Sequence, residues 1–292
     1  MTVRILLVGM NSFDSGKTQF AIRLSRFLSA KGQSIEYFKP LSGHNYWYNH
    51  DHTKICLESG ILASMDAMRV REHLNSKSPI ELANPVHSLF VPMRLGKPLQ
   101  NLRNSLGLSG ASSILTMERF SRPDKSGIDS TVLVAEELVE EERLIIKQEE
   151  VGMLTRGAAI VPVSNLEDVQ KFERLNFKKH VSESFSVVER SADVVIIEGF
   201  NDAAWPWDGL KFVDAVLLVS PAHVFSYDPE RFRKAAYLMN RGNLPIREVT
   251  FSRISDLLKP SNRLEFRPDG ELPSDELEHF VKSFRTGKKD IT

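Results

Sequence analysis

Short apolar runs alternate with helix-like patterns near the N-terminus and again in the C-terminal half. The runs at 3–8 and 34–38 have the composition of buried strands, and apolar residues from Lys17 to Lys31 recur every three or four positions. Three more strand-like runs lie at 193–198, 213–219 and, more weakly, 247–251. Strands that alternate with helices predict an α/β fold with a doubly wound, mostly parallel sheet.

The middle of the chain departs from this alternation. Residues 76–112 are rich in proline and predict loops. The segments 113–120 and 130–139 flank a turn and predict a hairpin, followed by a strand-like stretch at 158–163. Without a clear linker, we expect one domain over 1–292 with an insertion at about 91–160. Helices are predicted at 53–75, 166–191, 229–241 and 274–286.

Composition narrows the functional class. The 38 basic and 38 acidic residues among 292 give no electrostatic reason to expect nucleic acid as a partner. No apolar run approaches the roughly 18–20 residues of a membrane-spanning helix, so no membrane is expected. The single cysteine, Cys56, excludes a disulfide framework and a Cys-based zinc site, and it suits a reducing, cytoplasmic compartment. The histidines show no paired ligand spacing beyond His50-x-His52, so we expect no zinc.

A phosphate-binding loop is the clearest motif. Between the first strand and the first helix the chain matches G-x-x-x-x-G-K-[ST], except that asparagine stands at the first glycine position. Gly16 lets backbone amides close around phosphate, Lys17 reaches the β- and γ-phosphates, and the Thr18 hydroxyl completes a Mg²⁺ shell. A chance Gly-Lys-Thr at a helix start is the alternative. The matching residues are Asn11, Ser12, Phe13, Asp14, Ser15, Gly16, Lys17 and Thr18.

Three further residues are candidates for the site, two of them at the ends of predicted strands. Glu198 closes the run 193–198, at the edge where open α/β sheets bind ligands, and predicts a metal-linked acid; a solvated strand end is the alternative. Lys39 follows the second strand at the same edge, where it is suited to bind an anionic substrate or the γ-phosphate. Asp51, at the start of a helix, is either a helix N-cap or a second metal ligand.

Together these residues resemble the dethiobiotin synthetase family, within the wider group that includes cobyrinic acid synthases. The resemblance implies a fold of the P-loop NTPase type in which Thr18, Asp51 and Glu198 hold Mg²⁺. It also implies that Lys17 and Lys39 are the catalytic residues, which contact phosphate and the reacting anion. Four segments carry it: Val8 to Thr18, Lys39 to Gly43, Asn49-His50-Asp51 and Val194 to Gly199.

The chain also departs from that family. The Lys39 motif is one residue shorter, and Phe200-Asn201 follows Gly199 where the family has more glycine. Ser252-Arg253 stands where the family has an asparagine that reads adenine, and 91–160 has no counterpart. The base of the nucleotide and the acceptor substrate therefore stay open.

The expected function is that of a Mg²⁺- and ATP-dependent enzyme, with GTP as the alternative nucleotide. Such enzymes pass the γ-phosphoryl group to a carboxylate or carbamate of a small anionic substrate, and an amine then attacks the acyl phosphate. The alternatives are a nucleotide-dependent switch or assembly ATPase that acts on a protein partner, with 91–160 as partner surface, and a regulatory module with little turnover. The sequence leaves open whether the chain forms a homodimer.

Overall fold

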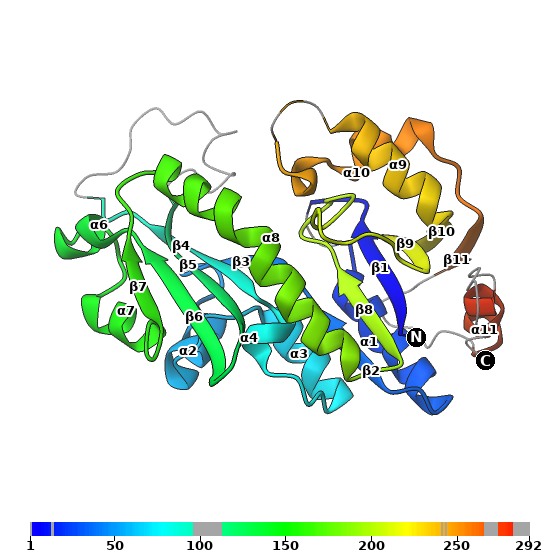
Figure 1. Cartoon of the computed structure of the whole chain (residues 1–292), viewed down its shortest axis with the longest axis horizontal. Coiled ribbons are helices and arrows are strands. Elements are labelled where there is room, and N and C mark those ends of the chain that lie inside the picture. The colour runs from blue at the N-terminus through cyan, green and yellow to red at the C-terminus, as the bar shows by residue number, and fades with distance from the viewer. Residues whose placement is uncertain are drawn as a thin grey trace.

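Two β-sheets with helices on their faces make up the described part of the chain (Figure 1). The α/β class predicted from the sequence is confirmed, but both sheets are mixed. The computed structural model describes residues 2–12, 15–95, 113–240, 242, 244–265 and 274–282.

The first sheet is parallel in its centre and antiparallel at one edge. Within the described residues its strand order is β11-β10-β9-β1-β8-β2. The strands β2, β8, β1 and β9 run parallel, whereas β10 and β11 are antiparallel to their neighbours. Its strands are β1 (Val3–Gly9), β2 (Ile35–Phe38), β8 (Val194–Glu198), β9 (Ala215–Ser220), β10 (His223–Tyr227) and β11 (Asn262–Glu265).

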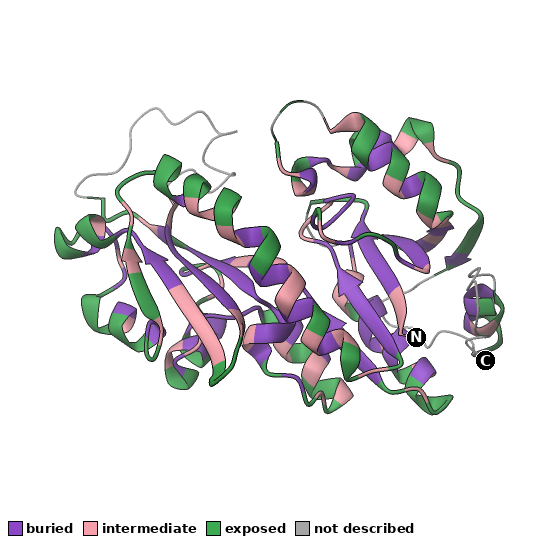
Figure 2. Ribbon diagram, viewed as in Figure 1, coloured by how far each residue is buried: buried purple, intermediate pink, exposed green. Residues whose placement is uncertain are grey.

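Alternate residues of β1 point to two different hydrophobic clusters, because successive side chains of a strand face opposite sides of the sheet. Ile5 and Leu7 pack toward α1 (Lys17–Ala30), α3 (Met65–Leu74) and α11 (Ser274–Lys282). Leu6 and Val8 pack toward α8 (Leu166–Arg190) and α9 (Pro229–Met239). The first sheet is therefore covered by helices on both faces, and its parallel strands β2, β8, β1 and β9 are purple along most of their length in Figure 2.

A second mixed sheet, of order β3-β4-β5-β6-β7, contains the hairpin and the strand near 158–163 that the sequence predicts. Its pairs β3–β4 and β6–β7 are parallel, and the others are antiparallel. The strands are β3 (Leu41–Asn45), β4 (Val86–Pro92), β5 (Ser113–Asp124), β6 (Gly127–Val134) and β7 (Ala159–Pro162). Short helices accompany it: α2 (His50–Ser59), α4 (Ile80–Ala83), α6 (Glu136–Glu140) and α7 (Gln148–Leu154).

The long helix α8 packs against both sheets, as Figure 1 shows. Toward its C-terminal end, Phe185 lies 5.1 Å from Phe38 of the first sheet, measured between ring centroids. Toward its N-terminal end, Phe172 lies 5.0 Å from Phe120 of the second sheet. One hydrophobic cluster therefore runs through both sheets, and segment 113–162 adds to that common core.

Two expectations about strands are wrong. The run at 247–251 is not a strand, because the backbone around Val249 and Phe251 bonds to the loop after β8 rather than to a sheet. Strand β4 lies in the proline-rich region 76–112, for which loops were expected. The rest of that predicted loop region, 96–112, lies outside the described residues. The elements around 247–251 are the 3₁₀ turns Ile246–Glu248 and Ser255–Leu257 and the short helix α10 (Phe251–Ile254).

In the described ranges, none of the helices combines the length and the apolar character needed to cross a bilayer.

A carboxyl group is buried between β5 and α8. Glu118 accepts a hydrogen bond from the Ser88 hydroxyl at 2.8 Å, and its second oxygen, Oε2, has no partner among the described residues. Burial, together with the charge of Glu173 on α8, raises the pKa of Glu118 to about 8 against the opposing charge of Arg247. Glu118 is therefore mostly protonated at neutral pH.

The contribution of Glu118 to the free energy of unfolding should fall as the pH rises from about 5 to about 8. In that window the unfolded chain has already ionised Glu118, whose ordinary pKa is 4.5, while the folded chain still holds the proton. Buried histidines such as His44 and His87, whose pKa values are lowered, contribute the opposite slope, so the test is the difference between variant and parent. Glu118→Gln should remove the falling contribution, so that its free energy of urea unfolding changes more positively with pH than that of the parent, and Glu58→Gln, an exposed control on α2, should not differ from the parent. An unchanged slope in Glu118→Gln would contradict the buried, protonated state.

Candidate functional site

A cleft of about 510 Å³ lies at the carboxyl ends of β1, β2 and β8. Parallel strands of an open α/β sheet present their ligand sites at this edge. From the predicted site, the cleft is lined by Ser12, Ser15, Gly16, Lys17, Thr18, Lys39 and Glu198. Asn11 is exposed and lies outside its walls, and Phe13 and Asp14 lie outside the described residues.

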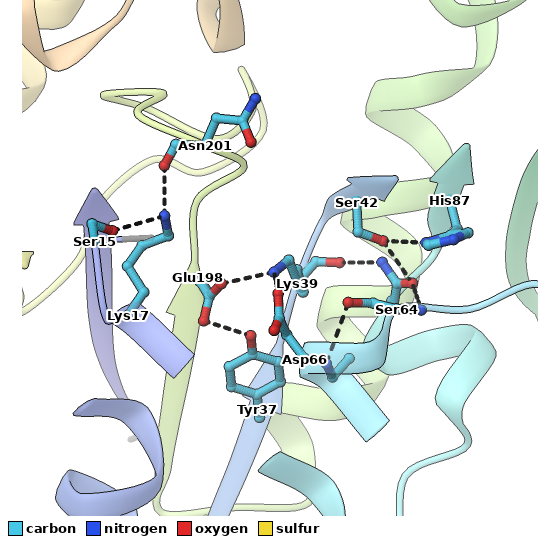
Figure 3. Close-up of polar contacts among 12 residues, drawn as sticks. Ser15, Lys17, Tyr37, Lys39, Ser42, Ser64, Asp66, His87, Glu198 and Asn201 are labelled. Carbon is cyan, nitrogen blue, oxygen red and sulfur yellow. Dashed lines mark hydrogen bonds and ion pairs between the residues drawn. The ribbon is translucent and has the colours of Figure 1, made fainter. Parts of the chain in front are cut away.

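The loop between β1 and α1 folds back so that Lys17 lies over the end of β1. Gly16 takes the left-handed conformation, with φ 87°, and α1 begins at Lys17. The Lys17 ammonium donates to the Asn201 carbonyl at 2.7 Å and to the Ser15 hydroxyl at 3.3 Å (Figure 3). A Cβ atom at Gly9 would lie 2.7 Å from that ammonium, so the close approach requires glycine.

At the centre of the cleft wall the Lys39 ammonium lies between two carboxylates (Figure 3). It is 2.6 Å from Asp66 Oδ2 and 2.7 Å from Glu198 Oε1. Glu198 also accepts a hydrogen bond from the Tyr37 hydroxyl at 2.7 Å, and Asp66 one from Thr18. Burial favours a neutral Lys39, but the charges of Glu198 and Asp66 outweigh it and raise the pKa of Lys39, which is therefore a cation.

Asn84 holds the start of α3 against the end of β2. Its buried amide nitrogen donates to the Lys39 carbonyl at 2.9 Å, and its oxygen accepts from the Ser64 backbone at 3.0 Å. Ser64 is the N-cap of α3 and accepts from the Ala67 amide, so Asp66 lies in the first turn. This side-chain bridge places the Asp66 carboxylate beside Lys39.

Asp51 was expected to join Thr18 and Glu198, but the structure places it elsewhere, so this expectation is wrong. The Asp51 side chain is 99% exposed and its contact is with Lys54, at 3.4 Å. The inward face of α2 is formed by His52, Thr53 and Cys56, so the neighbouring Asp51 points to solvent. Asp66 occupies the place expected for Asp51. Both helix starts have a polar residue two positions before an Asp: Asn49 before Asp51, and Ser64 before Asp66. The prediction chose Asp51.

The pairing of Lys39 with two acids leaves it no free charge for a further anion. Arg69, one turn after Asp66 on α3, also lines the cleft and is exposed. Among the described residues its guanidinium has no acidic partner. Sequence reasoning missed Arg69 because only the position of α3 brings it to the cleft.

Histidines from the second sheet and α2 line the end of the cleft away from Lys17. His44 and His52 reach the cleft, and His87 lies behind them, with its Nε2 2.6 Å from His44 Nδ1. Burial lowers the pKa of His44 to about 3 and places that of His87 well below its usual range. This wall is therefore neutral at pH 7, in contrast to the charged end at Lys17 and Lys39.

Comparison of the chain with protein-family models, with curated proteins and with solved structures finds no match.

Lys39→Met should destabilise the fold, because it leaves the buried Glu198 carboxylate beside Asp66 without the cation between them. Breaking a buried ion pair costs about 3–5 kcal/mol, and the partly exposed Asp66 favours the lower end. Urea unfolding should show this loss. Added Mg²⁺ should raise the free energy of unfolding of Lys39→Met by more than it raises that of the parent chain. Lys54→Met removes the exposed pair with Asp51 and should change little. Equal stability of the two variants would contradict this account of Lys39.

Proposed function

We propose that this chain is a Mg²⁺-dependent ATP-binding enzyme of the dethiobiotin synthetase-like, P-loop type, which transfers a phosphoryl group to a carboxylate or carbamate of a small acceptor. The observation that carries the proposal is the meeting of Lys17, Thr18, Asp66 and Glu198 in one cleft. These residues come from the start of α1, from α3 and from β8, at the edge of the sheet where α/β proteins bind ligands.

The phosphate end of the proposed site is the start of α1. This helix of 14 residues begins with free backbone N–H groups, and its dipole favours an anion there. Lys17 adds a cation at the same point. Its contact is with a backbone carbonyl, so a phosphate oxygen can replace that contact without leaving a buried acid unpaired.

The oxygen ligands expected of a magnesium site are present in the described residues. One ammonium already holds Asp66 and Glu198 at 2.6 and 2.7 Å, and Thr18 bonds to Asp66. Carboxylate and hydroxyl oxygens are the ligands that Mg²⁺ prefers. Thr18, Asp66 and Glu198 would hold the ion, which when bound supplies positive charge beside the transferring phosphoryl group.

The acceptor is proposed to lie between Arg69 and the histidine wall. Arg69 offers the free guanidinium that a carboxylate or carbamate requires, and Lys39 organises the two acids instead of binding the acceptor. The histidine wall is neutral, so it adds no further charge beside the acceptor. The protein's contribution would be to position and neutralise charge, so a nucleophilic side chain is not required.

One observation favours a second candidate, a nucleotide-dependent switch or assembly ATPase or GTPase. The full pairing of Lys39 removes the cation that was expected to bind the acceptor. A switch needs the phosphate and metal contacts alone. Hydrolysis of ATP or GTP that no small molecule stimulates, and that a protein partner does stimulate, would favour this candidate.

Lys17→Met should weaken ATP binding, and Asp66→Asn should lower Mg²⁺-dependent turnover, each by about tenfold or more. A charged hydrogen bond contributes about 1.5–3 kcal/mol, which corresponds to such a change. Titration calorimetry with ATP and GTP, and phosphate release at varied Mg²⁺, measure the two effects. Asp51→Asn is the matched control and should behave as the parent. Parental ATP affinity in Lys17→Met would remove the nucleotide proposal.

Arg69→Gln should reduce the acceptor-stimulated reaction more than basal hydrolysis, by about tenfold, because basal hydrolysis does not need a second anion. The measurement is stimulation of ATP hydrolysis by a panel of small carboxylic acids, and of amines with bicarbonate. Arg26→Gln, an exposed arginine on α1, is the control. Equal loss of both rates in Arg69→Gln would assign Arg69 to the nucleotide instead.

A further inference from the structure

Three residues with metal-binding side chains meet behind the wall of the cleft. His44 lies on β3, and His52 and Cys56 lie four residues apart on α2. All three are buried, and one potential ligand atom of each lies within 4.8 Å of the other two. No zinc was expected from the sequence, because these three residues come together only when β3 packs against α2.

The separation of two of these atoms suits a shared metal ion. His52 Nε2 lies 3.6 Å from Cys56 Sγ. Zinc binds imidazole nitrogen at about 2.0–2.1 Å and thiolate sulfur at about 2.3 Å, so two tetrahedral ligands of these kinds lie about 3.6 Å apart. A plain N–H···S hydrogen bond, from a His52 Nε2–H that also donates to the Ala63 carbonyl, explains the same distance, and titration with Co²⁺ separates the two explanations.

A chain of hydrogen bonds fixes the proton on His44. The amide nitrogen of Asn84 donates to two carbonyls, so its oxygen accepts the only hydroxyl proton of Ser42. Ser42 must then accept from His87 Nδ1, at 2.6 Å, and His87 Nε2 must accept from His44 Nδ1, also at 2.6 Å. His44 Nε2 therefore carries a lone pair, which faces the Thr53 hydroxyl at 3.2 Å. That hydroxyl can donate to the Asn49 carbonyl instead, also at 3.2 Å, which leaves the lone pair for a metal ion.

His87 is the kind of partner that metal-binding histidines typically have. Such histidines donate their other ring N–H to a neighbouring acceptor, which fixes the tautomer. Burial keeps His44 neutral, and a neutral imidazole needs to lose no proton before it binds a metal. His44 and His52 also line the cleft, which gives an ion a path from solvent.

We propose that His44, His52 and Cys56 form a binding site for a divalent ion of the zinc class, with a further coordination position open toward the cleft. Bonds would form from His44 Nε2, His52 Nε2 and Cys56 Sγ. The thiol proton goes to solvent, and the His52 proton moves from Nε2, where it bonds to the Ala63 carbonyl, to Nδ1. Two imidazoles and a thiolate select Zn²⁺ or Co²⁺ over Mg²⁺.

This site shares no residue with the proposed phosphate and magnesium site, which uses hydroxyl and carboxylate oxygens, although His44 and His52 also belong to the histidine wall beside the proposed acceptor. The two proposals can still fail separately, because zinc binding and nucleotide binding depend on different residues. Metal binding is measured without nucleotide, and loss of nucleotide turnover leaves it untouched.

The test begins with the full chain stripped of metal by a chelator and titrated with Co²⁺, then with Zn²⁺ in competition with a chromophoric chelator. The parent chain should bind one equivalent of Co²⁺ and develop a near-ultraviolet thiolate-to-cobalt charge-transfer band. Cys56→Ser should lose the band, and His44→Gln should bind Zn²⁺ at least about 100-fold more weakly, since loss of an outer partner alone costs about 10–100-fold. His50→Gln, an exposed histidine on the same helix, should match the parent.

A second measurement needs no variant. Cys56 is the only thiol of the chain, so its reaction with a thiol reagent in mild denaturant reports on this one side chain. Stoichiometric Zn²⁺ should slow that reaction at least tenfold, even if Cys56→Ser fails to fold. Absence of both the charge-transfer band and the protection in the parent chain would overturn the proposal, as would equal Zn²⁺ affinity in the parent chain and a folded His44→Gln.

Discussion

The Lys39 ammonium between Asp66 and Glu198 is the contact around which the cleft is organised. It joins the end of β2 to the end of β8 and to the first turn of α3, elements far apart in the chain. Two carboxylates this close repel each other, and burying both negative charges without a cation is costly in free energy. The Lys39 ammonium contacts both and offsets that cost, so the two acids are held in position. Tyr37 and Thr18 then complete their hydrogen bonding.

The second sheet determines the other half of the cleft. β3 carries Ser42 and His44, and β4 carries His87 behind them. Asn84, just before β4, bonds to both the Lys39 carbonyl and the Ser64 backbone, so the same polar side chain ties this sheet to the charged centre. The hydrophobic cluster through α8 holds the two sheets together. The cleft thus has a charged wall from the first sheet and a neutral wall from the second.

Local signals in the sequence found the parts of the site that depend on contiguous residues. The helix that begins at Lys17 and the strand that ends at Glu198 are each specified by a short run with the right flanks, and the structure has both elements where the sequence predicts them. Asp66 was missed because its placement depends on Asn84, a residue 18 positions further on (84 − 66) that no periodicity connects to it. The run at 247–251 has strand composition, yet its backbone partners lie in the loop after β8. Strands β3 and β4 were missed because one is mostly polar and the other is flanked by proline.

The charges around the cleft explain why a preformed acid pair is compatible with binding an anion. Lys17, Lys39 and Arg69 supply three positive charges against the two of Asp66 and Glu198, so these five groups sum to +1 (3 − 2). Among the described residues, Lys17 and Arg69 form no ion pair with either acid, so a polyphosphate can be attracted to them without first displacing a carboxylate from its partner. A divalent ion bound to the same two acids would change the balance further toward positive charge. Holding the carboxylates ready before any ligand arrives reduces the reorganisation that binding would otherwise require, which is the physical basis of a preorganised site. A protein that used Lys39 only as a free anion-binding group would instead have had to leave Glu198, which is 1% exposed, without a cation.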